Sequence, residues 1–135
     1  CYLKALSDEG INHNPEYLCY GNYSYKSGLR NMKRLLSMQE RPTAVFCISD
    51  IMAIGVIRSA MEENLKVPED LAVCGFDNIH FSWMVTPSRT TVSQPMYDLG
   101  CTAMDALIRI IEGKSSEPIH YFLEYELIIR ESTLK

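Results

Sequence analysis

Residues 44–76, AVFCISDIMAIGVIRSAMEENLKVPEDLAVCGF, decide the fold of this chain. The runs 44–48 and 71–76 are continuous apolar segments of strand length. Between them, apolar residues recur at helical spacing from Ile54 to Leu65. Two fully apolar strands joined by a helix are typical of a βαβ unit, so the stretch predicts an α/β fold with a mostly parallel sheet and helices on both of its faces.

Two polar residues, Ser49 and Asp50, lie between the first strand and the helix. Ser and Asp at this place favour an N-cap, in which the side-chain oxygen accepts a backbone N–H of the first turn. One interpretation is that both residues only cap the helix. The alternative is that one of them also contacts a ligand.

Similar patterns extend on both sides of this unit. Apolar spacing predicts a helix that ends before Gly10 and a second amphipathic helix, and alternation predicts a half-buried strand at a sheet edge near the end of the chain. The full set of further elements is a strand at 17–21, a helix at 27–38, a strand at 90–93, a helix at 95–113 and a strand at 119–129. The apolar face of helix 95–113 consists of Met96, Leu99, Ala103, Leu107 and Ile110.

Composition limits the class of protein. The 135 residues suit one ordinary domain, and 47% hydrophobic and 22% charged residues are typical of a soluble globular protein. The net charge of -4 and the lack of a basic run argue against direct nucleic-acid binding by this segment. We expect no membrane association, because no apolar run approaches the roughly 20 residues that span a bilayer. The first residues resemble a helix cut open rather than a signal peptide, which predicts a fragment.

The five cysteines are well separated, and their odd number excludes a complete set of internal disulfides. Cys47 and Cys74 lie inside apolar runs, which suits buried thiols in a reducing cytoplasm. His13, His80 and His120 are scattered, and neither GxGxxG nor GxxxxGK[ST] occurs. We therefore expect no catalytic residues, no metal site and no cofactor.

Candidate binding residues follow from the rule that ligands of open α/β sheets bind beyond the carboxyl ends of the strands. Ser49, Asp77 and Gln94 each follow one expected parallel strand, and Tyr23 could supply an aromatic wall. Such a mixture suits a sugar or a nucleoside. Simpler roles remain open: Asp77 with Asn78 as an Asx turn, and Gln94 as a helix cap or backbone partner.

The irregular loop 76–95 contains the only tryptophan. A loop of this length inside a compact domain is uncommon unless it has a function.

Three stretches carry a resemblance: PTAVFCISDIMAIGVIRSAMEENLKVPEDLAVCGFDN (42–78), TPSRTTVSQPMYDLGCTAMDALIRIIEGK (86–114) and ELIIREST (126–133). They closely resemble the C-terminal half of LacI/GalR-family transcriptional regulators. In that family a helix-turn-helix headpiece binds DNA, and a core similar to periplasmic sugar-binding proteins holds a small effector between two lobes. The resemblance implies that residues 1–135 are the C-terminal lobe of such a periplasmic-binding-protein-like (type I) core.

By the same resemblance, Asp77 and Gln94 match effector-contacting positions, and Tyr23 matches an aromatic residue that stacks on the effector. Ser49 stands where many members have asparagine. A further effector-binding arginine is expected upstream of Cys1, so the site is expected to be incomplete within these residues.

The resemblance also implies a homodimer interface formed by the loop 79–87 and the start of the helix from Ile51. Its expected residues are Ile54, Trp83, Met84 and Val85. The alternative for Trp83 is a place in the core of its own domain. Helix 95–113 is expected to pack on the N-terminal lobe; without that lobe, another surface of this chain or another copy would have to cover its apolar face.

The expected function is therefore effector sensing in a cytoplasmic transcriptional regulator, which would contact DNA only through a headpiece outside these residues. Two alternatives remain: a sugar-binding receptor of a transport system, which would share the fold and the cleft, and a sugar- or nucleotide-modifying α/β enzyme. Free cysteines argue against the first alternative.

Overall fold

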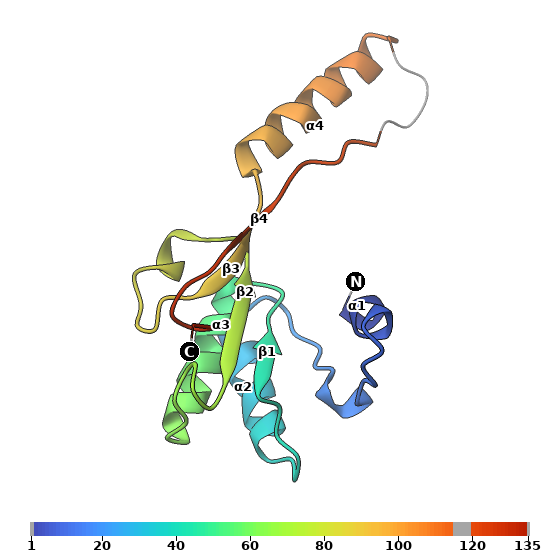
Figure 1. Cartoon of the computed structure of the whole chain (residues 1–135). Coiled ribbons are helices and arrows are strands. Elements are labelled where there is room, and N and C mark those ends of the chain that lie inside the picture. Colours follow the sequence, from blue (N-terminus) through green and yellow to red (C-terminus); the bar gives the residue numbers. More distant parts are fainter. Residues whose placement is uncertain (1, 115–119, 135) are drawn as a thin grey trace.

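The chain folds into a sheet with helices beside it, and one further helix stands apart (Figure 1). A computed structural model describes residues 2–114 and 120–134. The elements are α1 (Tyr2–Asp8), η1 (Pro15–Tyr17), α2 (Tyr25–Leu36), β1 (Ala44–Phe46), α3 (Asp50–Glu62), β2 (Ala72–Phe76), η2 (His80–Ser82), β3 (Thr90–Ser93), α4 (Met96–Ile111) and β4 (Glu126–Ile128), where η marks a 3-10 helix.

The sheet has four strands in the order β1-β2-β3-β4. β1 pairs with β2 and β2 with β3 in parallel, whereas β4 pairs with β3 antiparallel and forms one edge. The unit β1-α3-β2 is the βαβ unit that the apolar pattern predicts. The predicted α/β class with a mainly parallel sheet is thus confirmed.

Only one face of the sheet is well covered. Helices α2 and α3 lie together beside β1 and β2 (Figure 1), and every second residue of β2 is buried against them. On the opposite face, Phe46 is 50% exposed and contacts Phe76 edge to face at 6.4 Å between ring centroids. Helices thus flank the sheet as predicted, but among the described residues the close packing is on one face, because α2 and α3 share that face and α1 buries no residue.

The core lies between α2, α3 and the sheet. The helical spacing of apolar residues in α2 and α3 places them on the inner faces of both helices, and β2 adds further apolar side chains. Together these side chains exclude water. Its buried members are Met32, Leu35, Leu36, Cys47, Met52, Ala53, Val56, Ile57, Ala60, Leu71 and Val73.

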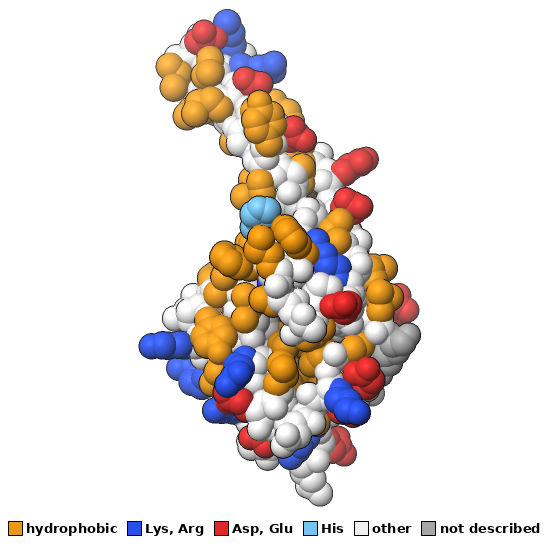
Figure 2. Space-filling view, turned by 90° about the vertical axis from the view of Figure 1, so that its left-hand side faces the viewer, with side chains coloured by type: hydrophobic (Ala, Val, Ile, Leu, Met, Phe, Trp, Pro, Cys, Tyr) orange, Lys and Arg blue, Asp and Glu red, His pale blue; other side chains and the backbone are white. Residues whose placement is uncertain are grey.

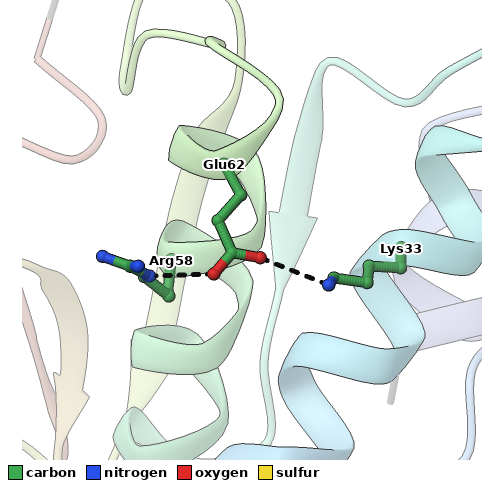
Figure 3. A network of polar contacts seen from close by, with 3 residues as sticks. All are labelled: Lys33, Arg58 and Glu62. Carbon is green, nitrogen blue, oxygen red and sulfur yellow. Dashed lines mark hydrogen bonds and ion pairs between the residues drawn. The ribbon is translucent and has the colours of Figure 1, made fainter.

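A surface ion-pair network joins the outer sides of α2 and α3 (Figure 3). The Glu62 carboxylate pairs with Lys33 Nζ of α2 at 3.2 Å and with Arg58 Nε, one turn earlier on α3, at 3.0 Å. Hydrogen bonds from Arg58 and then from Lys33 hold the pKa of Glu62 below its usual value.

This lowered pKa predicts a pH-dependent stability contribution. A carboxylate whose folded-state pKa is depressed stabilises the fold above its unfolded pKa, and loses that effect as the pH falls through the folded pKa. We expect Glu62→Gln to lower the melting temperature slightly at about pH 7, and this effect to become smaller towards about pH 2 as the folded-state carboxylate takes up a proton. The exposed neighbour Glu63 provides the control Glu63→Gln. An equal effect of Glu62→Gln at both pH values would contradict the prediction.

The predicted strand at 17–21 is wrong. Residues 15–17 form η1, and 18–22 form no strand. Side chains of α2 bind the carbonyl groups here: Asn31 Nδ2 donates to Tyr20 O at 2.9 Å, and Arg34 Nη2 donates to Leu18 O at 3.3 Å. An apolar pocket of about 330 Å³ separates this segment from β1, so the two do not pair.

The predicted strand at 119–129 is mostly absent. Residue 119 lies outside the described residues, 120–125 form no strand, and only Glu126–Ile128 do. The register explains this length. Ile128 pairs with Thr91 and Glu126 with Ser93, the last residue of β3, so the residues before Glu126 have no strand beside them.

The helix boundaries differ from the prediction by a few residues. α2 begins at Tyr25, because Ser24 caps it by accepting the N–H of Ser27. α3 ends at Glu62, before Leu65, and Asn64 next to that end has a positive φ of 59°.

Helix α4 projects from the end of β3 away from the sheet (Figure 1). It buries no residue, and the four large members of its predicted apolar face are all exposed: Met96, Leu99, Leu107 and Ile110. Figure 2 shows hydrophobic side chains along this projecting part. Within residues 2–114 and 120–134, the apolar face of α4 is therefore not covered by any other part of this chain.

None of the helices described is both long and apolar enough to cross a membrane.

Candidate functional site

Asp77 and Gln94 meet at the carboxyl ends of neighbouring parallel strands. Asp77 follows β2 and Gln94 follows β3, and the Gln94 Nε2 donates to Asp77 Oδ1 at 2.9 Å. Both residues are partly exposed. The parallel register brings an acid and an amide that are 17 residues apart to one place, as strand order predicts.

The backbone turns sharply at Asp77. Asp77 and Asn78 have φ values of 94° and 49°, a region that few residues other than glycine, asparagine and aspartate adopt. The Asp77 N–H donates to Val92 O at 2.9 Å, and the Asn78 N–H donates to Thr91 Oγ1 at 3.2 Å. The turn is therefore fixed to β3, while the Asp77 carboxylate bonds Gln94.

Gln94 does not cap α4. The cap position is Pro95, which makes no side-chain cap hydrogen bond, and the Gln94 side chain turns to Asp77 instead. The capping interpretation of Gln94 is therefore wrong. The Gln94 amide lies at the carboxyl end of β3, where an amide can donate to or accept from a ligand.

Sequence reasoning missed the role of Arg130. Its Nη2 donates to Asn78 Oδ1 at 2.9 Å and its Nη1 donates to Arg89 O at 2.8 Å. This guanidinium therefore supports the turn beside Asp77. The residues Arg130 and Asn78 are 52 positions apart, so no local pattern could indicate the contact.

Ser49 and Asp50 have different roles. Ser49 caps α3 by accepting the Met52 N–H at 3.3 Å, and its side chain is buried. Asp50 is the first residue of the helix, and its carboxylate instead accepts the Ile79 N–H at 2.9 Å and the Ser82 hydroxyl. The predicted N-cap role is thus confirmed for Ser49 and wrong for Asp50, while the predicted ligand contact of Ser49 stays a prediction.

Tyr23 lies in the turn before α2, with a φ of 62° and 64% of its surface exposed. Its ring is accessible to a ligand. Of the four predicted effector residues, Asp77 and Gln94 hydrogen bond to each other, whereas within the described residues Tyr23 and Ser49 make no hydrogen bond to either of them.

The apolar pocket beside β1 lies away from this pair. Its lining contains no charged residue and includes neither Asp77 nor Gln94. The pocket is formed by α2, α3, β1 and the segment 17–19, with Tyr2 also in the lining. It therefore does not correspond to the predicted effector site.

Two features bear on metal and thiol chemistry within residues 2–114 and 120–134. No group of three or more His, Cys, Asp or Glu side chains comes together there. Burial, and to a smaller extent the neighbouring Cys74, raises the pKa of the Cys47 thiol to about 12. Cys47 is therefore protonated at neutral pH and a poor nucleophile.

The loop after η2 exposes apolar side chains. Trp83 and Met84 are each 54% exposed, while Val85 and Ile54 are partly buried. The Trp83 ring packs edge to face on His80 with 5.6 Å between centroids. Figure 2 views the side of the molecule on which this loop lies and shows exposed hydrophobic side chains there. The alternative that Trp83 fills its own core is wrong.

Comparison with known proteins shows one consistent family. The family described as periplasmic binding protein-like domain matches residues 1–133. The HTH-type transcriptional repressor CytR of Escherichia coli (strain K12) is 41% identical over 132 residues, which cover 98% of this chain and 39% of that protein. Catabolite control protein A of Priestia megaterium is 39% identical over 132 residues, 98% of this chain and 40% of that protein.

A solved structure agrees. The transcriptional regulator CelR-cellobiose complex superimposes with a TM-score of 0.92 at 34% identity, covering 97% of this chain and 40% of that one. This sequence thus spans about two fifths of the length of these relatives.

Proposed function

We propose a function from the premise that this chain belongs to the family of periplasmic-binding-protein-like domains, in the form found in LacI-family transcriptional regulators. The proposed function is effector sensing: a small sugar-like or nucleoside-like molecule binds at the carboxyl edge of the sheet and controls DNA binding. The contact between Asp77 and Gln94 carries the proposal, because it offers an acceptor and a donor for ligand hydroxyl groups at one place.

The relatives support this choice of ligand and of class. One of them is described in complex with cellobiose, a sugar. The two curated relatives are named as a repressor and a control protein, which gives no support to the alternative of a transport receptor. Tyr23, whose ring is exposed, would stack on the ring of the effector. The Ser49 hydroxyl accepts the Met52 N–H, and its own proton would be donated to the effector.

The projecting helix α4 supports an interlobe cleft. Its apolar face is exposed, and it starts two residues after Gln94, at the mouth of the proposed site. We propose that this helix packs on an N-terminal lobe outside these residues. The effector would then lie between the two lobes, with Asp77 and Gln94 on this one.

The proposed mechanism is ligand-biased closure of the lobes. An effector shifts the equilibrium between open and closed arrangements only by the difference of its affinities for the two. A homodimer formed through Ile54, Trp83, Met84 and Val85 would transmit closure to a DNA-binding headpiece outside these residues. A protein that binds DNA through such a headpiece would act in the cytoplasm, so the proposal includes a cytoplasmic location.

The test is a single substitution in the complete regulator. A thermal-shift screen against sugars and nucleosides first identifies a compound that raises the melting temperature. We then expect Asp77→Ala to weaken binding of that compound by about ten- to a hundredfold, the range for a lost hydrogen bond to a charged group. Calorimetry measures the affinity, and DNA binding without the compound should stay unchanged.

The control is Glu69→Ala, which removes an exposed carboxylate at the other end of β2. Binding of the compound should not change in this variant. Unchanged affinity in Asp77→Ala would remove Asp77 from the site.

A further inference from the structure

Asp50 is a buried carboxylate that the proposed binding site does not use. The side chain is 0% exposed, and its Oδ2 accepts the Ile79 N–H at 2.9 Å and the Ser82 hydroxyl. Its Oδ1 lies against Gly75 of β2, where an added Cβ would overlap it. The carboxylate is therefore fixed between β2 and the 79–82 turn, which comprises η2 and Ile79.

The buried Arg89 binds the carbonyl groups of the same turn. Arg89 Nη2 donates to Phe81 O at 2.7 Å, and the Arg89 backbone N–H donates to Ser82 O at 2.8 Å. Burial lowers the pKa of Arg89, and the negative charge of Asp50 acts in the opposite direction. Thus a carboxylate accepts from the donors of the turn and a guanidinium donates to an acceptor, the pairing in which charge-assisted hydrogen bonds are strong.

The 79–82 turn lies between the two surfaces of the proposed function. Asp77, which bonds Gln94, is two residues before Ile79. Trp83, the first of the exposed apolar residues, directly follows Ser82. Because the chain is continuous, a displacement of the turn changes the position of both neighbours.

We infer that Asp50 is a positioning residue. Its bonds to Ile79 and Ser82 hold the 79–82 turn, and the turn fixes the position of Asp77 relative to the surface Trp83–Val85. A ligand that displaces Asp77 then alters the partner surface through this turn. The roles of Asp77 in effector binding and of Trp83–Val85 in dimerisation rest on the proposed function. The hold of Asp50 on the turn rests on the hydrogen bonds alone.

Three variants of the complete regulator test the inference. Ser82→Ala removes one hydroxyl from the turn, and Asp50→Asn removes the charge that accepts both bonds. Ser59→Ala is the matched control, because Ser59 is equally buried on α3 and its hydroxyl has no partner among the described residues. Ser82→Ala keeps the test decisive if Asp50→Asn fails to fold.

The first measurement is amide hydrogen exchange without any ligand. We expect exchange in residues 79–85 to become about tenfold faster in Ser82→Ala and Asp50→Asn, and to stay unchanged in Ser59→Ala. The emission of Trp83, the single tryptophan, reports the same loop. Unchanged exchange in the folded variants would overturn the positioning role.

The second measurement is the subunit dissociation constant by sedimentation. We expect Ser82→Ala to raise it by about tenfold and Ser59→Ala to leave it unchanged. Faster exchange with an unchanged dissociation constant would overturn the link to the partner surface. A wild-type regulator that stays monomeric at every concentration would instead contradict the proposed homodimer, and exchange measured in that monomer would still test the hold of Asp50 on the turn.

Discussion

Replacing Leu71 with alanine is expected to lower the free energy of unfolding by about 2–5 kcal/mol, the usual range for truncating a buried leucine. Leu71 directly precedes β2, is almost fully buried and belongs to the core between α2, α3 and the sheet. The truncation removes buried methyl groups and leaves a cavity that close-packed neighbours fill only in part. Urea denaturation measures the loss.

Leu134→Ala is the matched control for this substitution. Leu134 lies near the end of the chain with its side chain exposed, so its truncation should change the free energy of unfolding by no more than about 0.5 kcal/mol. A similar loss in both variants would show that Leu71 is not a core residue.

Replacing Gly28 with alanine is expected to destabilise the protein by about 1–3 kcal/mol, the usual cost of overpacking. Gly28 is buried on α2 where this helix crosses α3, and an added Cβ would overlap the backbone carbonyl of Met52. A backbone group cannot rotate away as a flexible side chain can. The two helices would have to move apart, which opens the core between them.

Gly100→Ala is a control in which we expect the stability to rise instead of fall. Gly100 is also inside a helix, α4, but nothing lies within 4 Å of an added Cβ. Alanine should therefore stabilise this helix by about 0.5–1 kcal/mol through helix propensity alone. Since the same propensity acts at Gly28, the difference between the two variants isolates the overlap. Equal effects in thermal denaturation would contradict the close approach of α2 and α3.

The successful predictions share a local origin. β1, α3 and β2 follow from apolar runs and helical spacing within 33 residues, and Pro95 with Gly113 marks the two ends of α4. Each of these signals depends on neighbours in sequence. Even the meeting of Asp77 with Gln94 follows from such signals, because strand direction alone places the ends of parallel strands at one edge.

The failed predictions concern pairing. Residues 17–21 have the composition of a strand but no strand beside them, and residues 120–125 alternate well beyond the point where β3 ends. Alternation shows that a segment can pair, but the partner decides whether it does. In the same way, Trp83 is apolar enough for a core, yet the turn before it directs the ring outward.

The sequence by itself determined the βαβ unit 44–76, the helices α2 and α4, that the sheet is mainly parallel, and the family to which the chain belongs. Only the tertiary structure decided that Asp50 bonds Ser82 across 32 residues and that Arg130 bonds Asn78 across 52. The physical reason is that periodicity is a property of adjacent residues. The meeting of distant polar groups depends on the register of the sheet and the packing of helices on it, which the whole chain fixes together.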